Sequence, residues 1–290
     1  MSLNEGFVEV TGGKVWYQIH ESVKKNTPVI ILHGGPGSSH YSLQGLRILA
    51  EDRPVIFYDQ LGCGKSDRPT DNSLWTIDRF VEELGLIRAV LSLERFHILG
   101  HSWGTTLAAA YYLDKPEGVK SIIFSSPCLS APMWAEDQEE NRKKLPLNVQ
   151  QTLKAHEEKG TTDSEEYKEA TNIFNNHFVC RLDPYPEFLA EGKKYKNPDV
   201  YNIMWGPSEF YVTGNLKKFD CTSELHQIKI PTLYTCGRYD EATPKSTEYF
   251  SSLTPNSQFH VFEQSAHMPY LEEQEEYVRV VGDFLRKTDS

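Results

Sequence analysis

A serine stands between two glycines at residues 100–104, in the stretch "GHSWG". The apolar run "FHILG" leads into it, and the helix-like run "TTLAAAYYL" follows it. A G-x-S-x-G sequence between a strand and a helix is typical of a nucleophile elbow, a sharp turn that exposes a serine hydroxyl. The turn strains the backbone of the serine, and we expect the flanking glycines to accommodate that strain. Ser102 is therefore the candidate nucleophile, and the alternative is a glycine-rich turn with an N-capping serine.

A serine hydroxyl is a weak nucleophile, so it needs an imidazole to accept its proton and an acid to orient that imidazole. In chains with this elbow the order is serine, acid, histidine. Asp240 in "CGRYDEATP" directly follows a late strand-like run, and His267 in "EQSAHMPY" follows the last one. We expect Asp240 and His267 to complete a triad with Ser102. The alternative is that they are an ordinary turn aspartate and an ordinary loop histidine.

An acyl-transfer enzyme also needs two backbone N–H groups for the oxyanion, each contributing about 3 kcal/mol to transition-state stabilisation. The stretch "HGGPG" at residues 33–37 comes directly after the first buried strand. We expect one donor to be the Gly35 N–H and the other to be the N–H of Trp103, the residue after the nucleophile. Taken alone, "HGGPG" also fits a simple Pro-Gly turn.

The elements that position these residues alternate between strands and helices. Residues 6–10 and 14–20 resemble a hairpin joined at Gly12-Gly13. Short continuous apolar runs, which are typical of strands buried on both faces, follow at residues 28–32, 54–58, 96–100, 121–125, 230–237 and 257–263. With helical stretches between them and an amphipathic helix expected over 272–286, the pattern predicts an α/β-hydrolase fold with a mainly parallel, doubly wound sheet.

This alternation stops between about Pro127 and His226, where charge-rich helical segments such as "WAEDQEENRKKL" replace the buried strands. We expect a helical cap there, and we interpret its charge runs as solvated helix faces. The predicted organisation is a hydrolase core in two parts, residues 1–126 and 227–290, around a cap at 127–226.

Composition excludes several classes of protein. The formal net charge of −11 argues against a nucleic-acid partner, which would need clustered Lys and Arg. No apolar stretch approaches the roughly 20 residues that cross a bilayer, and the N-terminal residues lack a signal-peptide pattern, so we expect no membrane partner and a cytoplasmic location. Five scattered cysteines without a CxxC pair, and ten histidines without HExxH, predict neither disulfides nor a metal, and no cofactor is expected.

Six stretches together resemble the proline iminopeptidase family of α/β-hydrolases. They are "ILHGGPG", "FYDQLGCGKS", "GHSWG", "GPSEFYVTG", "GRYDEATP" and "SAHMPYLEEQEEY". The resemblance extends from about Gly6 to Leu285, and the stretches around residues 209 and 241 are the most specific. It implies a serine aminopeptidase that releases an N-terminal residue, proline or another small apolar one, from a small peptide or amino-acid amide with a free N-terminus.

The resemblance also implies that two glutamates, Glu209 and Glu241, bind the free amine of the substrate. This role is physically reasonable, because a buried ammonium needs opposite charge and hydrogen bonds to offset its desolvation. An internal peptide bond would leave the two carboxylates buried and unpaired. The alternatives are a solvated helix-end acid for Glu209 and a surface residue beside the triad for Glu241.

Two other functions stay open. The same triad would serve an amino-acid amidase, an esterase or a lactonase, and a ligand-binding receptor could retain this fold with a decayed site. A dehalogenase or epoxide hydrolase is disfavoured, because those enzymes use an aspartate where this chain has Ser102. The sequence does not predict the oligomeric state.

Overall fold

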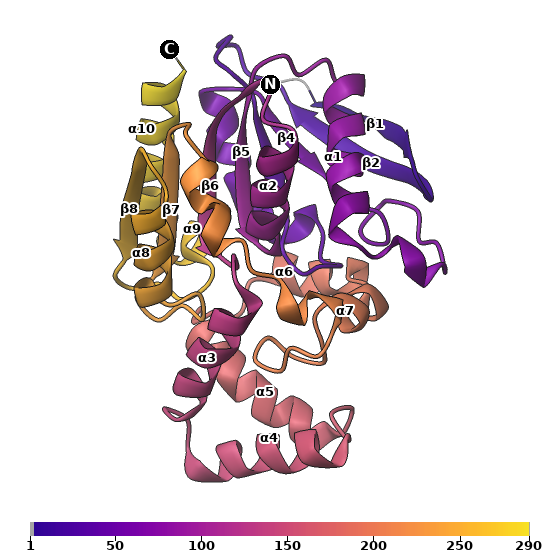
Figure 1. The fold of residues 1–290 in the computed structure, drawn as a ribbon, viewed down its shortest axis with the longest axis vertical. Helices are drawn as coiled ribbons and strands as arrows, with labels where there is room; N and C mark the ends of the chain where they lie inside the picture. The colour runs from indigo at the N-terminus through magenta and orange to yellow at the C-terminus, as the bar shows by residue number, and fades with distance from the viewer. Residues whose placement is uncertain (1–2, 290) are drawn as a thin grey trace.

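The computed structural model describes residues 3–289, and at its centre is one eight-stranded sheet (Figure 1). The strand order across the sheet is β1-β2-β4-β3-β5-β6-β7-β8. The strands are β1 (Leu3–Val10), β2 (Gly13–His20), β3 (Val29–Leu32), β4 (Val55–Tyr58), β5 (Phe96–Ser102), β6 (Val119–Pro127), β7 (Thr232–Gly237) and β8 (Ser257–Phe262). Each run expected to be a strand is one, with ends shifted by at most two or three residues.

The sheet is antiparallel at one edge and parallel elsewhere. β1 and β2 form a hairpin in which Val10 pairs with Gly13, and β2 also runs antiparallel to β4. All pairings from β4 through β3 to β8 are parallel. The carboxyl ends of β5, β7 and β8 therefore lie at the same edge of the sheet. This arrangement confirms the predicted α/β-hydrolase fold, and it brings together the loops that carry Ser102, Asp240 and His267.

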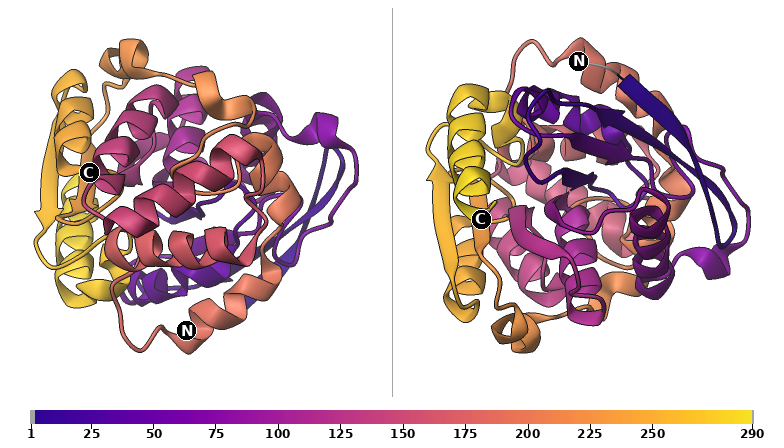
Figure 2. Two further views of the ribbon diagram at one scale, coloured as in Figure 1. Left: turned by 90° about the horizontal axis from the view of Figure 1, so that it is seen from below. Right: turned by 90° about the horizontal axis from the view of Figure 1, so that it is seen from above.

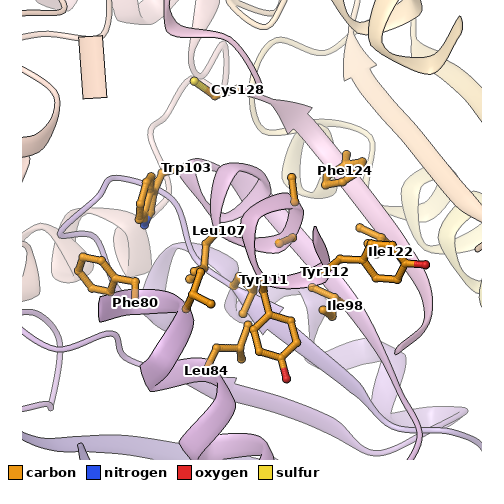
Figure 3. Packing of buried hydrophobic residues seen from close by; sticks show 14 of the residues in the cluster. Phe80, Leu84, Ile98, Trp103, Leu107, Tyr111, Tyr112, Ile122, Phe124 and Cys128 are labelled. Carbon is orange, nitrogen blue, oxygen red and sulfur yellow. The ribbon is translucent and has the colours of Figure 1, made fainter. Parts of the chain in front are cut away.

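Helices cover both faces of the sheet. On one face lie α1 (Ile77–Val90), α2 (Trp103–Asp114) and α8 (Pro244–Leu253), in front of the strands in Figure 1. On the other face pack the 3₁₀ segment η1 (His40–Glu51) and the C-terminal helix α10 (Gln274–Thr288), which follows the short α9 (Pro269–Glu272). In Figure 3, Leu107 of α2 lies among buried residues of α1 and of the strands. Because both faces are covered, the central strands are largely apolar, as their sequences predicted.

The chain leaves the sheet after β6 and returns to it at β7. Between them, within residues 128–231, the structure has isolated bridges but no strand. The helices there are α3 (Ala131–Arg142), α4 (Leu147–Lys159), α5 (Glu165–Phe178), α6 (Glu187–Gly192) and α7 (Pro198–Met204), and the 3₁₀ turns are η3 (Lys193–Tyr195), η4 (Asn215–Lys218) and η5 (Thr222–Gln227). A further 3₁₀ turn, η2 (Asn72–Leu74), precedes α1. We use the name cap for residues 127–226, and these boundaries stay a prediction.

The outer part of the cap has a small core of its own. Leu153 of α4, Phe174 and Phe178 of α5, and Phe210 pack together, with the rings of Phe174 and Phe210 4.6 Å apart. Two backbone hydrogen bonds join the end of α5 to the loops that follow β7 and β8. The N–H of Glu241 donates to the carbonyl of Phe178, and the N–H of His267 donates to the carbonyl of Val179. Figure 2 shows the cap helices crossing one end of the sheet when the molecule is seen from below. The cap is thus fixed to the loops that carry the candidate site.

No helix among the described residues is long and apolar enough to cross a membrane. All five cysteines are free and buried. Within residues 3–289, no three His, Cys, Asp or Glu side chains form a group arranged to hold a metal ion.

Candidate active site

Ser102 lies at the sharp turn between β5 and α2. Its φ of 56° is in the left-handed region and its ψ is −124°, so the strain expected of an elbow falls on the serine itself. The two flanking glycines are needed because backbone segments come very close together here. A Cβ at Gly100 would collide with the backbone of Gly104, and one at Gly104 would collide with the carbonyl of Leu32 on β3. The elbow therefore needs glycine on both sides because strand and helix backbones touch there.

Thr105 fixes this turn to the neighbouring strand. Its hydroxyl donates to the carbonyl oxygen of Ser102 at 2.6 Å and accepts from the N–H of Cys128 at 2.9 Å. Cys128 directly follows β6, so the hydroxyl bridges two adjacent strand ends. In the sequence, only the position of Thr105 three residues after the nucleophile pointed to this bridging role.

The carboxylate of Asp240 accepts a hydrogen bond from His267 Nδ1 at 2.7 Å. It is fully buried and also accepts from the Ser126 hydroxyl at 2.7 Å and from the N–H of Ala242 at 2.7 Å. Because His267 uses Nδ1 for Asp240, its Nε2 is left for the nucleophile. Ser126 has a φ of 52° at the end of β6, and nothing in the sequence distinguished it as a positioning residue.

Ser102 and His267 line the same cavity, which has a volume of about 290 Å³. Among the described residues no hydrogen bond joins the Ser102 hydroxyl to the imidazole, and such bonds are often long before substrate binds. The ring of His101 lies beneath His267 and its Nε2 is bonded to the His267 carbonyl at 2.7 Å. Burial lowers the pKa of His101 to about 3, so this ring stays neutral and supports the loop of His267.

The two backbone donors expected for an oxyanion are close to Ser102. Gly35 lines the main cavity together with Ser102, and both residues also border a smaller space beside Trp103. As the first residue of α2, Trp103 has an N–H without an intrahelical acceptor. Gly35 has a φ of 115°, which suits glycine alone, and a Cβ there would collide with the next turn of the loop.

Gln60 couples these two donor segments. Its side-chain amide donates to the carbonyl of His33 at 3.1 Å, and its carbonyl oxygen accepts from the Trp103 indole at 2.8 Å. The side chain is buried. Gln60 follows β4 in the stretch "YDQ". A polar residue directly after a buried strand is a signal in the sequence for a position near the site, and it could have identified Gln60.

Glu241 has a fully buried carboxylate for which the described residues provide no hydrogen-bond partner. Its Oε1 lies 3.6 Å from His267 Nε2, the ring nitrogen that faces away from Asp240. Burial, with the nearby charges of Glu209 and Asp240, raises the pKa of Glu241 well above its usual range. A buried carboxylate without a partner is costly, and this cost is the physical reason for the raised pKa.

Glu209 reaches the cavity from the cap. It is half-buried and lines the cavity together with Ser102 and His267. Its backbone carbonyl accepts from the indoles of Trp134 at 2.8 Å and Trp205 at 3.3 Å. Four of the seven candidate residues, Gly35, Ser102, Glu209 and His267, line this cavity. Trp103 borders the smaller space beside it, and Asp240 and Glu241 lie against His267 without lining either space.

The smaller space beside Ser102 is enclosed mainly by apolar side chains. Its walls include the rings of Trp103, Trp134 and Trp205 together with Cys128, and its volume is about 10 Å³. Such a volume holds about one water molecule.

Comparison with known proteins agrees with this geometry. The sequence pattern of the α/β-hydrolase fold family matches residues 27–274, so the chain is an α/β-hydrolase, the class that its sheet and elbow define. A proline iminopeptidase of Heyndrickxia coagulans is 67% identical over 282 residues, which are 97% of this chain and 98% of that protein. A proline iminopeptidase of Clostridium botulinum is 38% identical over the whole of both chains.

Two crystal structures superpose on nearly the whole chain. That of VinJ is 34% identical with a TM-score of 0.94, covering 98% of this chain and 99% of VinJ. That of the proline iminopeptidase of Mycobacterium smegmatis is also 34% identical, with a TM-score of 0.91 and 99% of each chain covered. This chain belongs to the proline iminopeptidase family, as its motifs predicted, and it is an enzyme of the serine hydrolase type.

Proposed function

We propose that the protein is a serine aminopeptidase that releases proline, or another small apolar residue, from the free N-terminus of short peptides. Ser102, His267 and Asp240 form its triad, Gly35 and Trp103 its oxyanion hole, and Glu209 and Glu241 its amine site. The names of the family relatives support this class of reaction. The substrate and the roles of these residues are our inference from the geometry.

The reaction follows from the positions of these groups. Ser102 Oγ attacks the carbonyl carbon of the first residue while its proton passes to His267 Nε2, and Asp240 stabilises the imidazolium that forms. The N–H groups of Gly35 and Trp103 hold the developing oxyanion. The imidazolium then gives its proton to the leaving amine as the C–N bond breaks. Water repeats the sequence on the acyl-enzyme and releases the free amino acid.

The observation that carries the proposal is the unpartnered carboxylate of Glu241 beside His267 Nε2. The α-nitrogen of the first residue is only two bonds from the carbonyl carbon that Ser102 attacks. A carboxylate 3.6 Å from the base is therefore within reach of that amine. An acylated or internal nitrogen would carry no charge and would leave Glu241 buried and unpaired, which is the kind of mismatch that gives strong discrimination.

The size of the released residue is limited by the space beside Ser102. Trp103, Trp134 and Trp205 surround a volume of only about 10 Å³. A compact apolar group such as the proline ring gains contact with these rings after a small displacement of the tryptophans. A long side chain would need a larger displacement, and a charged one would be buried without a hydrogen-bond partner.

A matched set of substrates tests the proposal. The arylamides of proline, alanine and leucine are compared with their N-acetyl forms, using kcat/KM as the readout. We expect cleavage of the free-amine forms, with proline or alanine ahead of leucine, and a loss of about 10³-fold or more on N-acetylation. Equal rates on the free and the acetylated forms would contradict the proposed amine site and would favour an esterase or general amidase.

A further inference from the structure

The main cavity extends beyond the reactive groups to a part of its wall that the mechanism above does not use. Its lining there includes Lys196 and Asn197, between η3 and α7, and Thr171 and Asn175 of α5. Lys196 is the only lysine or arginine among the described residues that line this cavity. The opposite charge in the lining is that of Glu209, which belongs to the proposed amine site.

Lys196 has no carboxylate within 4.0 Å of its ammonium in the part of the chain that the structure describes, whereas Lys194 nearby pairs with Glu191 at 2.7 Å. The residue is exposed overall, yet burial lowers the pKa of its ammonium, with the charge of Glu209 acting in the opposite direction. The ammonium of Lys196 thus lacks a direct ion-pair partner among the described residues. An anion that entered the cavity would supply that partner.

The segment that carries Lys196 is held firmly. The guanidinium of Arg68 donates to the carbonyls of Tyr195 at 2.7 Å and of Lys196 at 3.4 Å. The side chain of Asn197 donates to the carbonyl of Gly62 at 2.7 Å. The backbone below the ammonium is therefore tied to the core loops after β4, so the position of Lys196 along the cavity wall is fixed.

Two polar atoms of α5 share this wall. Thr171 Oγ1 and Asn175 Oδ1 are both buried, and neither has a hydrogen-bond partner among the described residues. Buried polar atoms without partners are uncommon in folded proteins and call for an explanation. A hydroxyl suits a carboxylate oxygen, and an amide suits the N–H or C=O of a peptide bond.

We propose that Lys196, assisted by the Thr171 hydroxyl, binds the C-terminal carboxylate of a peptide of two or three residues, while Asn175 Oδ1 accepts from a backbone N–H of that peptide. This inference rests on the proposed aminopeptidase function, because it assigns the other end of the same substrate. Such a peptide is about 7–11 Å long when extended. A cavity of about 290 Å³ is at the small end of ligand pockets and suits a ligand of that size. The Glu209 carboxylate and the Lys196 ammonium in the lining of the cavity complement the two charges of a zwitterion.

The test compares prolylglycine with prolylglycinamide, which differ only in the terminal charge. The readout is the ratio of their kcat/KM values in the wild type, in Lys196→Met, in Lys196→Arg and in the control Lys194→Met, which removes an equal charge from the neighbouring surface. We expect the wild type to favour the dipeptide. Lys196→Met should lower the ratio about 10- to 100-fold, as for one charge-assisted contact, Lys196→Arg should restore part of it, and Lys194→Met should leave it within about 2-fold.

Two results with Lys196→Met would contradict the proposed carboxylate site. A ratio unchanged in Lys196→Met, or an equal loss on both substrates, would show that the lysine only balances Glu209 and would overturn the carboxylate site. If the wild type released nothing from either substrate, the proposed function would fail separately. The carboxylate site would then be judged in Ser102→Ala by calorimetry, where prolylglycine must bind at least about 10-fold more tightly than its amide and lose that margin in Ser102→Ala/Lys196→Met.

Discussion

At the scale of single residues, the whole reaction depends on one hydroxyl held in a strained backbone conformation at the end of β5. Replacing Ser102 with alanine should lower kcat on a prolyl arylamide by about 10⁴- to 10⁶-fold, because neither His267 nor the oxyanion donors can supply a nucleophile. Labelling with a serine-reactive phosphonate gives an independent readout, since the wild type should incorporate one equivalent and the variant none. A variant that kept its rate would contradict the assignment of Ser102.

The two glutamates should affect recognition of the substrate's free amine and not the acyl-transfer step itself. We expect Glu241→Gln to lower kcat/KM on a prolyl arylamide by about 10²-fold or more, because the ammonium loses a buried charged partner. The same variant should change hydrolysis of a simple acyl ester by less than about 3-fold. Glu209→Gln should show the same division with a smaller loss, since Glu209 is half-buried and better screened. Equal losses on both substrates would contradict the amine site.

The environment of Glu241 also predicts a pH profile. Its pKa is raised by burial and by the charges of Glu209 and Asp240, so the carboxyl ionises at a higher pH than an ordinary glutamate does. Only the ionised form pairs with an ammonium, and kcat/KM on a free-amine substrate should therefore rise with pH through this raised pKa. It should fall again above about pH 8, where the α-amine of the substrate loses its proton.

An acyl ester provides the control for this profile. Its kcat/KM should lack the limb that belongs to Glu241, and the prolyl arylamide profile of Glu241→Gln should lack it too. If the free-amine and ester profiles of the wild type had the same acid limb, that limb would come from the catalytic base alone and not from Glu241.

At the scale of elements, the active edge depends on how closely α2 approaches the sheet. Gly104→Ala should destabilise the fold by about 3 kcal/mol or more, because its Cβ would meet backbone atoms of Leu32 and His33 that cannot rotate away. The control is Gly85→Ala at a half-buried position of α1. A Cβ there comes no closer than 3.7 Å to the Lys115 side chain, so the substitution should be neutral or slightly stabilising. Urea unfolding of both variants measures the difference, and equal midpoints would contradict the close-packing account of the elbow.

The elements themselves were largely predictable from the sequence. Buried parallel strands have continuous apolar runs, and the run at 121–125, with three apolar residues in a row, is recognisable as β6 without any knowledge of its neighbours. Positioning contacts were not predictable in this way. Ser126 and Thr105 are short polar residues of the kind that cap any turn, and their roles depend on which strand ends lie next to each other. That information is in the sheet order, and the local pattern does not contain it.

At the scale of the whole molecule, the cap completes the site. The core supplies the proposed triad, whereas Glu209, Trp134 and Trp205 come from the cap. The carbonyls of Phe178 and Val179 accept hydrogen bonds that hold the cap against the loops of Glu241 and His267. The charge-rich sequence of residues 127–226 predicted helices correctly. It could not show which polar groups face the cavity, because in the sequence Glu209 and Lys196 resemble the surface residues around them. Only the folded structure places both in the lining of the cavity.

The most direct measurement is the product analysis of one tetrapeptide with N-terminal proline and of its N-acetyl form, each followed by mass spectrometry with the wild-type enzyme. If an activated serine works beside carboxylates that bind the first amine, the free peptide loses its proline as the first product and the acetylated peptide stays intact. Cleavage of the acetylated peptide, or first cleavage at an internal bond of the free one, would contradict that claim.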